Sequence, residues 1–278
     1  MKIAVIGKSG QLATCLKDMA PSEFEISFYG RDEVDITKAE TYAPLKFANL
    51  IINCSAYTAV DKAEECPEDA YAINRMGVIQ LVQFCEENQM KLIHFSTDFV
   101  FDGEASTPYT EDDFTGPKSI YGASKLAGEE VILQSSLSAL VIRTSWLYSH
   151  FGHNFCKTML RLGNELSELS VVNDQIGTPT SALDLARVVF QIIQSGLPDT
   201  PVLFHISNAG QCSWADFARE IFIQKQLSVT VTNTTTEAFN APAPRPKYSV
   251  LSTEKLLFTY GIAMRFWKDA LKEVLSAL

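Results

Sequence analysis

Short, nearly continuous apolar runs recur along much of the chain, each bounded by polar or turn-forming residues. A strand that is buried on both faces of a parallel sheet has this pattern, whereas a half-exposed strand alternates apolar and polar positions. The runs that we interpret as buried strands are Lys2–Gly7, Phe24–Tyr29, Asn49–Cys54, Lys91–Ser96, Ala139–Thr144 and Val202–Ile206. They predict a sheet made mainly of parallel strands.

Segments with helical character alternate with these runs. Pro67 suits the first turn of a helix, where its missing N–H group has no partner to lose, and Thr180 or Ser181 would cap another helix. The predicted helices are Gln11–Met19, Pro67–Asn88, Ser119–Gln134, Ala182–Ser195 and Trp214–Lys225. Strands that alternate with helices in this way predict an α/β fold, a doubly wound parallel sheet of the Rossmann type with helices on both faces.

The last third of the chain is less regular. Ala241–Pro246 contains three prolines and predicts an extended loop. We therefore expect a smaller C-terminal substrate-binding lobe of residues 149–174 and 208–278, approximately. Residues 1–148 and about 175–207 would form the dinucleotide-binding domain. The ligand should lie at the carboxyl ends of the strands.

Composition narrows the function classes. The formal net charge of -10 makes a nucleic acid or an anionic membrane surface an unexpected partner. No apolar run approaches the ~18 residues of a membrane span, and Met1–Gly10 lacks the features of a signal peptide. We therefore expect a cytoplasmic protein. The cysteines are scattered without a C-x-x-C pair, which predicts reduced thiols and no metal site, and His94 lies in an apolar run that predicts a core position.

The loop after the first run contains Gly7 and Gly10, followed by the small residue Ala13. Glycines there let the backbone turn sharply and approach a pyrophosphate at a helix N-terminus. Two glycines are also found in ordinary strand–helix connections, so the motif is weak when taken alone. Its position between an apolar strand and a helix favours dinucleotide binding.

The second run ends in Gly30-Arg31-Asp32, where a dinucleotide would place its adenosine ribose. Arg31 favours the 2′-phosphate of NADPH, while the neighbouring Asp32 leaves NADH open. A solvated loop arginine is the alternative interpretation. The sequence therefore predicts NADPH or NADH as cofactor.

Tyr121 and Lys125 are spaced to share one face of the predicted helix, one turn apart. A nearby ammonium would lower the pKa of a phenol, whose ordinary value of ~10 is too high for proton transfer near neutrality. Thr97 follows an apolar strand and could bind a reacting carbonyl. Each residue also has a structural interpretation: Tyr121 and Lys125 could be a pair on a surface helix, and Thr97 could be a hydroxyl that caps the end of a strand. The combination of the three favours catalysis.

These motifs together resemble an extended short-chain dehydrogenase/reductase. More narrowly, nearly the whole chain is similar to the branch of the dTDP-4-dehydrorhamnose reductases. The segments that carry the resemblance are GKSGQL (7–12), TAVDKAE (58–64), STDFVF (96–101), YGASKLAGE (121–129), RTSWLY (143–148), NFCKTMLRL (154–162), NDQIGTPT (173–180) and RPKYSVLSTEK (245–255).

The resemblance implies reduction of the C4 ketone of dTDP-4-dehydro-L-rhamnose to dTDP-L-rhamnose. Tyr121 would give the proton, Lys125 would hold the nicotinamide ribose, and Thr97 would orient the carbonyl oxygen. The implied cofactor contacts are Gly7, Gly10, Gln11, Leu12, Arg31, Asp35, Ile36, Ala56, Tyr57, Thr58, Tyr121 and Lys125. The implied substrate contacts are Thr97, Asp98, Trp146, Asn154, Gln175 and Arg245, where Trp146 and Arg245 also suit structural roles.

The chain departs from this branch at several positions. Phe99 and Tyr248 stand where relatives commonly have tyrosine and asparagine, which removes one possible hydroxyl contact and alters the nucleotide loop. Cys15, Leu183 and Ala277 align with glutamates that bridge a metal in some dimeric relatives, so we expect a monomer or a weak homodimer without a bridging metal. A reductase or epimerase of another nucleotide-sugar, or a non-catalytic regulatory subunit, remains the alternative.

Overall fold

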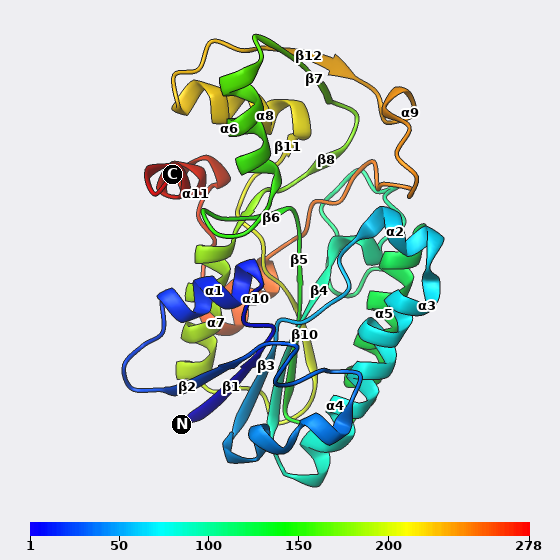
Figure 1. Cartoon of the computed structure of the whole chain (residues 1–278), viewed down its shortest axis with the longest axis vertical. Helices are drawn as coiled ribbons and strands as arrows, with labels where there is room; N and C mark the ends of the chain where they lie inside the picture. Colours follow the sequence, from blue (N-terminus) through cyan, green and yellow to red (C-terminus); the bar gives the residue numbers. More distant parts are fainter.

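The computed structural model describes residues 1–278 and is built around a six-stranded, wholly parallel sheet (Figure 1). The strands stand in the order β10-β5-β4-β3-β1-β2. They are β1 (Lys2–Ile6), β2 (Glu25–Tyr29), β3 (Leu50–Asn53), β4 (Lys91–Thr97), β5 (Ala139–Thr144) and β10 (Val202–His205). All six predicted strands are confirmed, and so is the doubly wound fold class.

Helices cover both faces of this sheet (Figure 1). The helices α1 (Gln11–Asp18), α7 (Ala182–Ser195) and α10 (Glu254–Tyr260) lie on one face, and α3 (Pro67–Tyr71), α4 (Gly77–Glu87) and α5 (Ile120–Leu133) lie on the other. Alternate residues of a strand point to opposite faces. Ile3 and Val5 accordingly join the core beneath α1 and α7, while Ala4 and Ile6 join the core beneath α4.

The helix predicted for Pro67–Asn88 is not continuous, which corrects the sequence-based expectation. A separate helix α2 (Val60–Glu65) precedes α3, and a π-helical turn η3 (Ala72–Met76) separates α3 from α4. Within this wide turn the buried Asn74 bonds both the backbone of Tyr57 and the hydroxyl of Ser124, at 2.9 Å each. The hydrophobic period of a regular helix does not predict this turn, because the turn is stabilised by the hydrogen bonds of a buried amide.

A group of elements above the carboxyl ends of the sheet forms the upper part of the molecule (Figure 1). Only α8 (Trp214–Gln224) among them was predicted as a helix. The others are α6 (Phe155–Glu165), β7 (Glu168–Val172), β12 (Thr230–Thr234), α9 (Thr236–Phe239) and α11 (Trp267–Ser276). The predicted loop Ala241–Pro246 indeed has no regular structure.

Short elements complete the chain. They are η1 (Ala39–Thr41), η2 (Ala43–Phe47), η4 (Asp98–Val100), β6 (Leu147–Tyr148), β8 (Ile176–Gly177), β9 (Thr180–Ser181) and β11 (Cys212–Ser213). The predicted division into two domains stays a prediction. Within the range assigned to the lobe, α10 packs on the sheet, where the ring of Tyr260 lies 5.5 Å from that of Phe204 on β10. None of the helices combines the length and the hydrophobicity that a membrane crossing requires.

Candidate active site

A cavity of about 220 Å³ opens at the carboxyl ends of β1 and β3. β2 and β3 are the two neighbours of β1 in the sheet, so the strand order reverses its direction at β1. The carboxyl ends of β1 and β3 are therefore the switch point of the fold. Ligands of doubly wound proteins bind at such a point. The predicted cofactor residues that line this cavity are Gly7, Gly10, Arg31, Asp35, Ile36 and Ala56.

The glycine loop brings the backbone close to β3 and leaves a helix end open. Gly7 has a φ of +92°, and a Cβ atom there would lie 3.0 Å from the carbonyl carbon of Cys54 and from the amide nitrogen of Ser55. Gly10 precedes α1, and no side chain caps that helix. The first N–H groups of α1 are therefore free to bind an anion. This arrangement fits a dinucleotide whose pyrophosphate is held by the loop Gly7–Gly10.

Arg31 and Asp35 stand at the outer edge of this cavity. The Asp35 carboxylate accepts hydrogen bonds from the Thr37 hydroxyl at 2.7 Å and from the Thr37 amide at 3.0 Å. Burial raises the pKa of Asp35, but the bonds from Thr37 and the pairing with Arg31 outweigh it and hold the pKa below its usual range. The Arg31 side chain is 77% exposed, so its guanidinium is free to approach the 2′-phosphate of a cofactor.

Three other predicted cofactor residues, Leu12 on α1 and Tyr57 and Thr58 after β3, do not line this cavity. Leu12 is buried in the core under α1, and Thr58 is exposed. The Tyr57 amide donates to the side chain of Asn74, which holds the chain after β3. Direct contacts of these residues with a cofactor stay predictions.

Gln11 and Asn154, predicted for cofactor and substrate respectively, are bonded to each other. The Asn154 amide donates to Gln11 Oε1 at 2.8 Å, and its oxygen accepts from the Lys157 amide, so that Asn154 caps α6. Gln11 also donates to the carbonyl of Leu147 at 3.1 Å. Both residues therefore join the start of α1 to the start of α6, and Asn154 does not line either cavity described here.

The predicted catalytic group gathers at the carboxyl end of β4. The Thr97 hydroxyl donates to Asp98 Oδ1 at 3.0 Å. Lys125 Nζ donates to the carbonyl of Phe95 at 2.6 Å. The ring of Tyr121 lies edge-on to that of Phe99, with centroids 5.6 Å apart. Residues from β4, from η4 and from one face of α5 thus meet as the spacing predicted.

The protonation of Tyr121 and Lys125 differs from the prediction. Burial raises the pKa of Tyr121 to about 12, although a hydrogen bond with Thr97 opposes this. Burial also lowers the pKa of Lys125 to about 8, against the pull of the Glu129 carboxylate. The net shift of the Tyr121 pKa is therefore upward and not downward as expected, because burial outweighs the opposing contact. Tyr121 is protonated at neutral pH, which suits a proton donor.

Asp98 was predicted to contact the substrate, but it is buried, with 2% of its surface exposed. Its carboxylate accepts from the Thr97 hydroxyl, and burial raises its pKa to about 6. The structure thus gives Asp98 a contact with Thr97, and a direct contact with substrate stays a prediction.

A second cavity, of about 460 Å³, lies among the elements above the sheet. Its walls are mainly apolar, and the predicted substrate residues Trp146, Gln175 and Arg245 contribute to them. Phe99 lines the same cavity and contacts Tyr121, so the predicted catalytic group has a neighbour in this cavity wall. A cavity of this size and character suits the ring systems of a nucleotide-linked ligand.

The position of Trp146 is compatible with both interpretations that the sequence left open, and its contact with a sugar stays a prediction. Its ring lines the cavity and stacks on the ring of Trp214, with centroids 3.5 Å apart and an angle of 6° between the planes. Its backbone is in the left-handed region at a φ of +46°, which is uncommon for a bulky residue. The Trp214 indole in turn donates to Gln175 Oε1 at 3.1 Å.

Arg245 is held by an acidic partner that the sequence analysis did not single out. Its Nη2 atom donates to both carboxylate oxygens of Asp61 on α2, at 2.9 Å each, and Nη1 donates to the carbonyl of Ala243. The Arg245 side chain is 21% exposed and lines the second cavity. Its predicted role toward a diphosphate stays a prediction, because such a group would have to share the guanidinium with Asp61.

Comparison with known proteins decides the family. The family model described as RmlD substrate binding domain matches residues 1–278. The chain belongs to the RmlD substrate binding domain family. A dTDP-4-dehydrorhamnose reductase of Sinorhizobium fredii is 40% identical, over 100% of this chain and 98% of that protein.

Two solved structures resemble this RmlD-family chain over its full length. A dTDP-4-dehydrorhamnose reductase from Clostridium acetobutylicum has a TM-score of 0.94 and 43% identity, covering 100% of this chain and 99% of the other. The enzyme of that name from Bacillus anthracis, solved in complex with NADP, has a TM-score of 0.95 and 36% identity over the same shares. The fold of this RmlD-family chain is therefore that of solved reductases.

The sequence analysis missed much of the wall of the second cavity. Phe155, Met159 and Leu162 come from α6, and their spacing of four and then three residues is that of one helix face. That periodicity was a usable signal for both the helix and its apolar face. Trp214 and Phe239 gave no such signal, because a tertiary arrangement alone brings α8 and α9 to the cavity.

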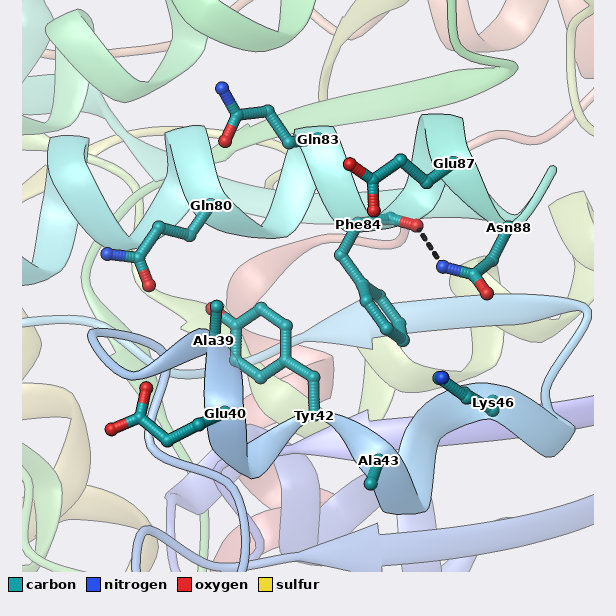
Figure 2. Close-up of a pocket in the computed structure, with 10 residues that line it drawn as sticks. All are labelled: Ala39, Glu40, Tyr42, Ala43, Lys46, Gln80, Gln83, Phe84, Glu87 and Asn88. Carbon is teal, nitrogen blue, oxygen red and sulfur yellow. Dashed lines mark hydrogen bonds between the residues drawn. The ribbon is translucent and has the colours of Figure 1, made fainter.

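A larger hollow, of about 520 Å³, lies elsewhere on this RmlD-family chain (Figure 2). It is bounded by residues 39–46 on one side and by α4 on the other, where Tyr42 and Phe84 pack edge-on at 5.3 Å. None of the predicted site residues lines it. Its volume alone therefore does not make it the active site.

Replacing Gly7 by alanine tests the dinucleotide cavity. The left-handed φ and the 3.0 Å approach to Cys54 and Ser55 should together cost about 1–3 kcal/mol of stability, and the shifted loop should bind NADPH more weakly. Cofactor fluorescence titration and urea unfolding measure the two effects. Gly196→Ala is the matched control, since Gly196 shares a positive φ of +100° but has no atom within 4 Å of its Cβ position. Unchanged NADPH affinity in Gly7→Ala would argue against this cavity as the cofactor site.

Proposed function

We propose that this chain is a reductase that uses NADPH or NADH to reduce the C4 ketone of dTDP-4-dehydro-L-rhamnose, giving dTDP-L-rhamnose. It is an oxidoreductase with the fold and the family of the reductases described above. The observation that carries the proposal is that Tyr121 and Lys125 are each connected to one of the two cavities through neighbouring side chains. Phe99, which lines the apolar cavity, packs against Tyr121. Lys125 contacts His94 on β4, which contacts Asn53 on β3, and Asn53 is bonded to Ser55 in the wall of the dinucleotide cavity.

The reduced nicotinamide, when bound, supplies the hydride. Tyr121 gives its phenolic proton to the oxygen that becomes the C4 hydroxyl, and its raised pKa keeps that proton in place until the oxygen gains charge. Thr97 positions the same oxygen by turning its hydroxyl hydrogen from Asp98 Oδ1 to that oxygen. The apolar walls around Trp146 and Phe155 exclude water from the reacting ketone.

Arg31 supports a preference for NADPH. Its side chain is largely exposed at the outer edge of the dinucleotide cavity, whereas the nearby Asp35 already accepts two hydrogen bonds from Thr37 and pairs with Arg31. The NADP complex of the Bacillus anthracis relative agrees with this choice.

Cofactor oxidation in the presence of the keto-sugar tests the function. The purified chain receives NADPH or NADH together with dTDP-4-dehydro-L-rhamnose, and the loss of reduced cofactor is followed by absorbance. We expect substrate-dependent oxidation, faster with NADPH, and dTDP-L-rhamnose as product. Oxidation only with a different nucleotide-linked ketone would reassign the substrate. No oxidation by a folded chain that binds cofactor would favour a non-catalytic role.

We also propose that the chain works in the cytoplasm as a monomer or a weak homodimer without a bridging metal. Cys15, Leu183 and Ala277 support this, because none of them offers the carboxylate oxygens that a divalent cation would need. Sedimentation with and without a chelator measures the oligomeric state.

A further inference from the structure

Lys125 is held from beneath by a buried chain of side chains that starts in the dinucleotide cavity. Ser55 lines that cavity and donates to Asn53 Oδ1 from its amide at 3.0 Å and from its hydroxyl at 2.6 Å. Asn53 Nδ2 lies 3.0 Å from His94 Nδ1, and His94 Nε2 lies 3.2 Å from Lys125 Nζ. Asn53 and His94 are each 1% exposed.

The first link fixes the orientation of the Asn53 amide. A backbone N–H group can only donate, so the atom of Asn53 that faces the Ser55 amide has to be its oxygen. The amide nitrogen of Asn53 must then face His94. Because that nitrogen is a donor without a lone pair to offer, His94 Nδ1 has to be the acceptor.

The second link follows from the first. A neutral imidazole carries one N–H group, so a histidine that accepts at Nδ1 carries its hydrogen on Nε2. Burial and then Lys125 lower the pKa of His94 well below its usual range, so this ring is neutral. His94 therefore presents an N–H donor to Lys125 Nζ at 3.2 Å. An ammonium group cannot accept such a bond, but a neutral amine can.

We propose that Asn53 and His94 are positioning residues that make Lys125 accept a hydrogen bond from His94 Nε2–H while it donates to the Phe95 carbonyl. Protonation of Lys125 then places an ammonium N–H group against the Nε2–H group of His94. The alternative is that His94 moves its hydrogen to Nδ1, where it meets the N–H group of the Asn53 amide. Either outcome disfavours the charged lysine. The pair thus keeps Lys125 able to gain and lose a proton near neutral pH, where a free lysine would stay charged.

Other charged groups around Lys125 act in the opposite direction or are already paired. On its own helix, Glu129 favours the ammonium, but this carboxylate is bonded by Arg143 of β5 at 2.7 Å. Tyr121 lies one turn earlier on the same helix and is protonated. Asp98 lies beside Thr97 at the end of β4 and acts on Tyr121. His94 is the group on β4 that meets the amine directly.

The tautomer of His94 gives a test that does not depend on any substrate. Two-bond ¹⁵N–¹H correlation spectra of the full chain distinguish a hydrogen on Nε2 from one on Nδ1. The structure predicts the Nε2–H form for His94 in the unsubstituted chain. A hydrogen on Nδ1 at neutral pH would overturn the proposal without the need for any variant.

Asn53→Asp reverses the chain of donors and tests its effect on Lys125. The carboxylate keeps the acceptor for Ser55 but accepts from His94 Nδ1–H, so that Nε2 becomes an acceptor for the Lys125 ammonium. We expect the Lys125 titration, followed by ¹³C and ¹⁵N signals of labelled lysine, to move upward by about one pH unit or more. An unmoved titration in a folded variant would contradict the proposal. His205→Gln is the control, because it replaces another buried histidine away from Lys125. It should leave the ¹³C and ¹⁵N titration of Lys125 unchanged.

The link to catalysis rests on the proposed reductase function. A phenolate that forms on Tyr121 is stabilised by a nearby ammonium, so activity should fall as Lys125 loses its proton. The basic limb of the kcat profile should therefore move upward in Asn53→Asp by the same amount as the Lys125 titration. A moved titration without any reductase activity would sink the proposed function and leave the hydrogen-bond assignment standing. A moved titration with an unmoved basic limb would overturn the catalytic link of the pair.

Discussion

Replacing Tyr121 by phenylalanine is expected to lower kcat for the reduction of the keto-sugar by about 10²- to 10⁴-fold. In the proposed mechanism this hydroxyl is the proton donor, and burial keeps it protonated at neutral pH with a pKa of about 12. The phenylalanine ring retains the edge-on contact with Phe99, so the packing of α5 should persist. Steady-state kinetics with saturating cofactor and keto-sugar measure the effect.

Cofactor binding separates a chemical loss from a structural one in that variant. Tyr121 is not among the residues that line the dinucleotide cavity, so the affinity for NADPH should change little. Leu126→Met on the same helix, outside both cavities, is a matched control for helix packing and should keep activity within a few-fold. Near-normal turnover by Tyr121→Phe would remove Tyr121 from the mechanism.

Replacing Glu129 by leucine is expected to destabilise the chain by about 3–5 kcal/mol. Glu129 on α5 is fully buried and accepts three hydrogen-bond contacts from Arg143 on β5, whose side chain is 4% exposed. Without the carboxylate, the guanidinium stays buried with the Phe101 ring at 4.9 Å and loses its charged partner. The free energy of unfolding in urea measures this cost.

Two further variants identify the cause of that loss. Glu129→Leu with Arg143→Met replaces both charges by apolar groups, so it should recover most of the stability that the single change removes. Arg161→Met breaks an exposed ion pair with Glu165 on α6 and should cost less than about 1 kcal/mol. A single Glu129 variant as stable as the unsubstituted chain would contradict the role of the buried pair.

The sequence predicted the sheet well because its strands are buried on both faces. Runs such as Ala139–Thr144 have no competing helical period and are too short for a long helix, so the strand interpretation was the simplest. Val202–Ile206 was expected as a buried strand, and it pairs with β5 as β10. Local pattern and global fold agree in these segments.

The elements above the sheet were largely missed for a different reason. β7 and β12 are short and half-exposed, and each is stabilised by pairing with the other across about sixty residues of sequence. α9 spans only Thr236–Phe239, too short for any periodicity. Such elements depend on partners that are distant in sequence, and local composition carries little information about them.

The sequence predicted which residues belong to the candidate site better than it predicted their hydrogen-bond and ion-pair partners. Local spacing brought Tyr121 and Lys125 to one helix face, and strand ends brought Thr97 and the glycine loop to one edge of the sheet. Asp61 as the partner of Arg245, and His94 as the partner of Lys125, depend on contacts between separate segments. His94 is in the core, as its apolar run predicted, but its hydrogen bonds give it a second role.

The position of the transferred hydrogen tests the central claim most directly. Reduced cofactor that carries deuterium at the transferable position is incubated with the chain and dTDP-4-dehydro-L-rhamnose, and the product is examined by NMR spectroscopy. We predict deuterium at C4 of dTDP-L-rhamnose, one atom for each cofactor oxidised. A product without deuterium at C4, or no product from a folded chain that binds the cofactor, would contradict the assignment as a C4 ketone reductase.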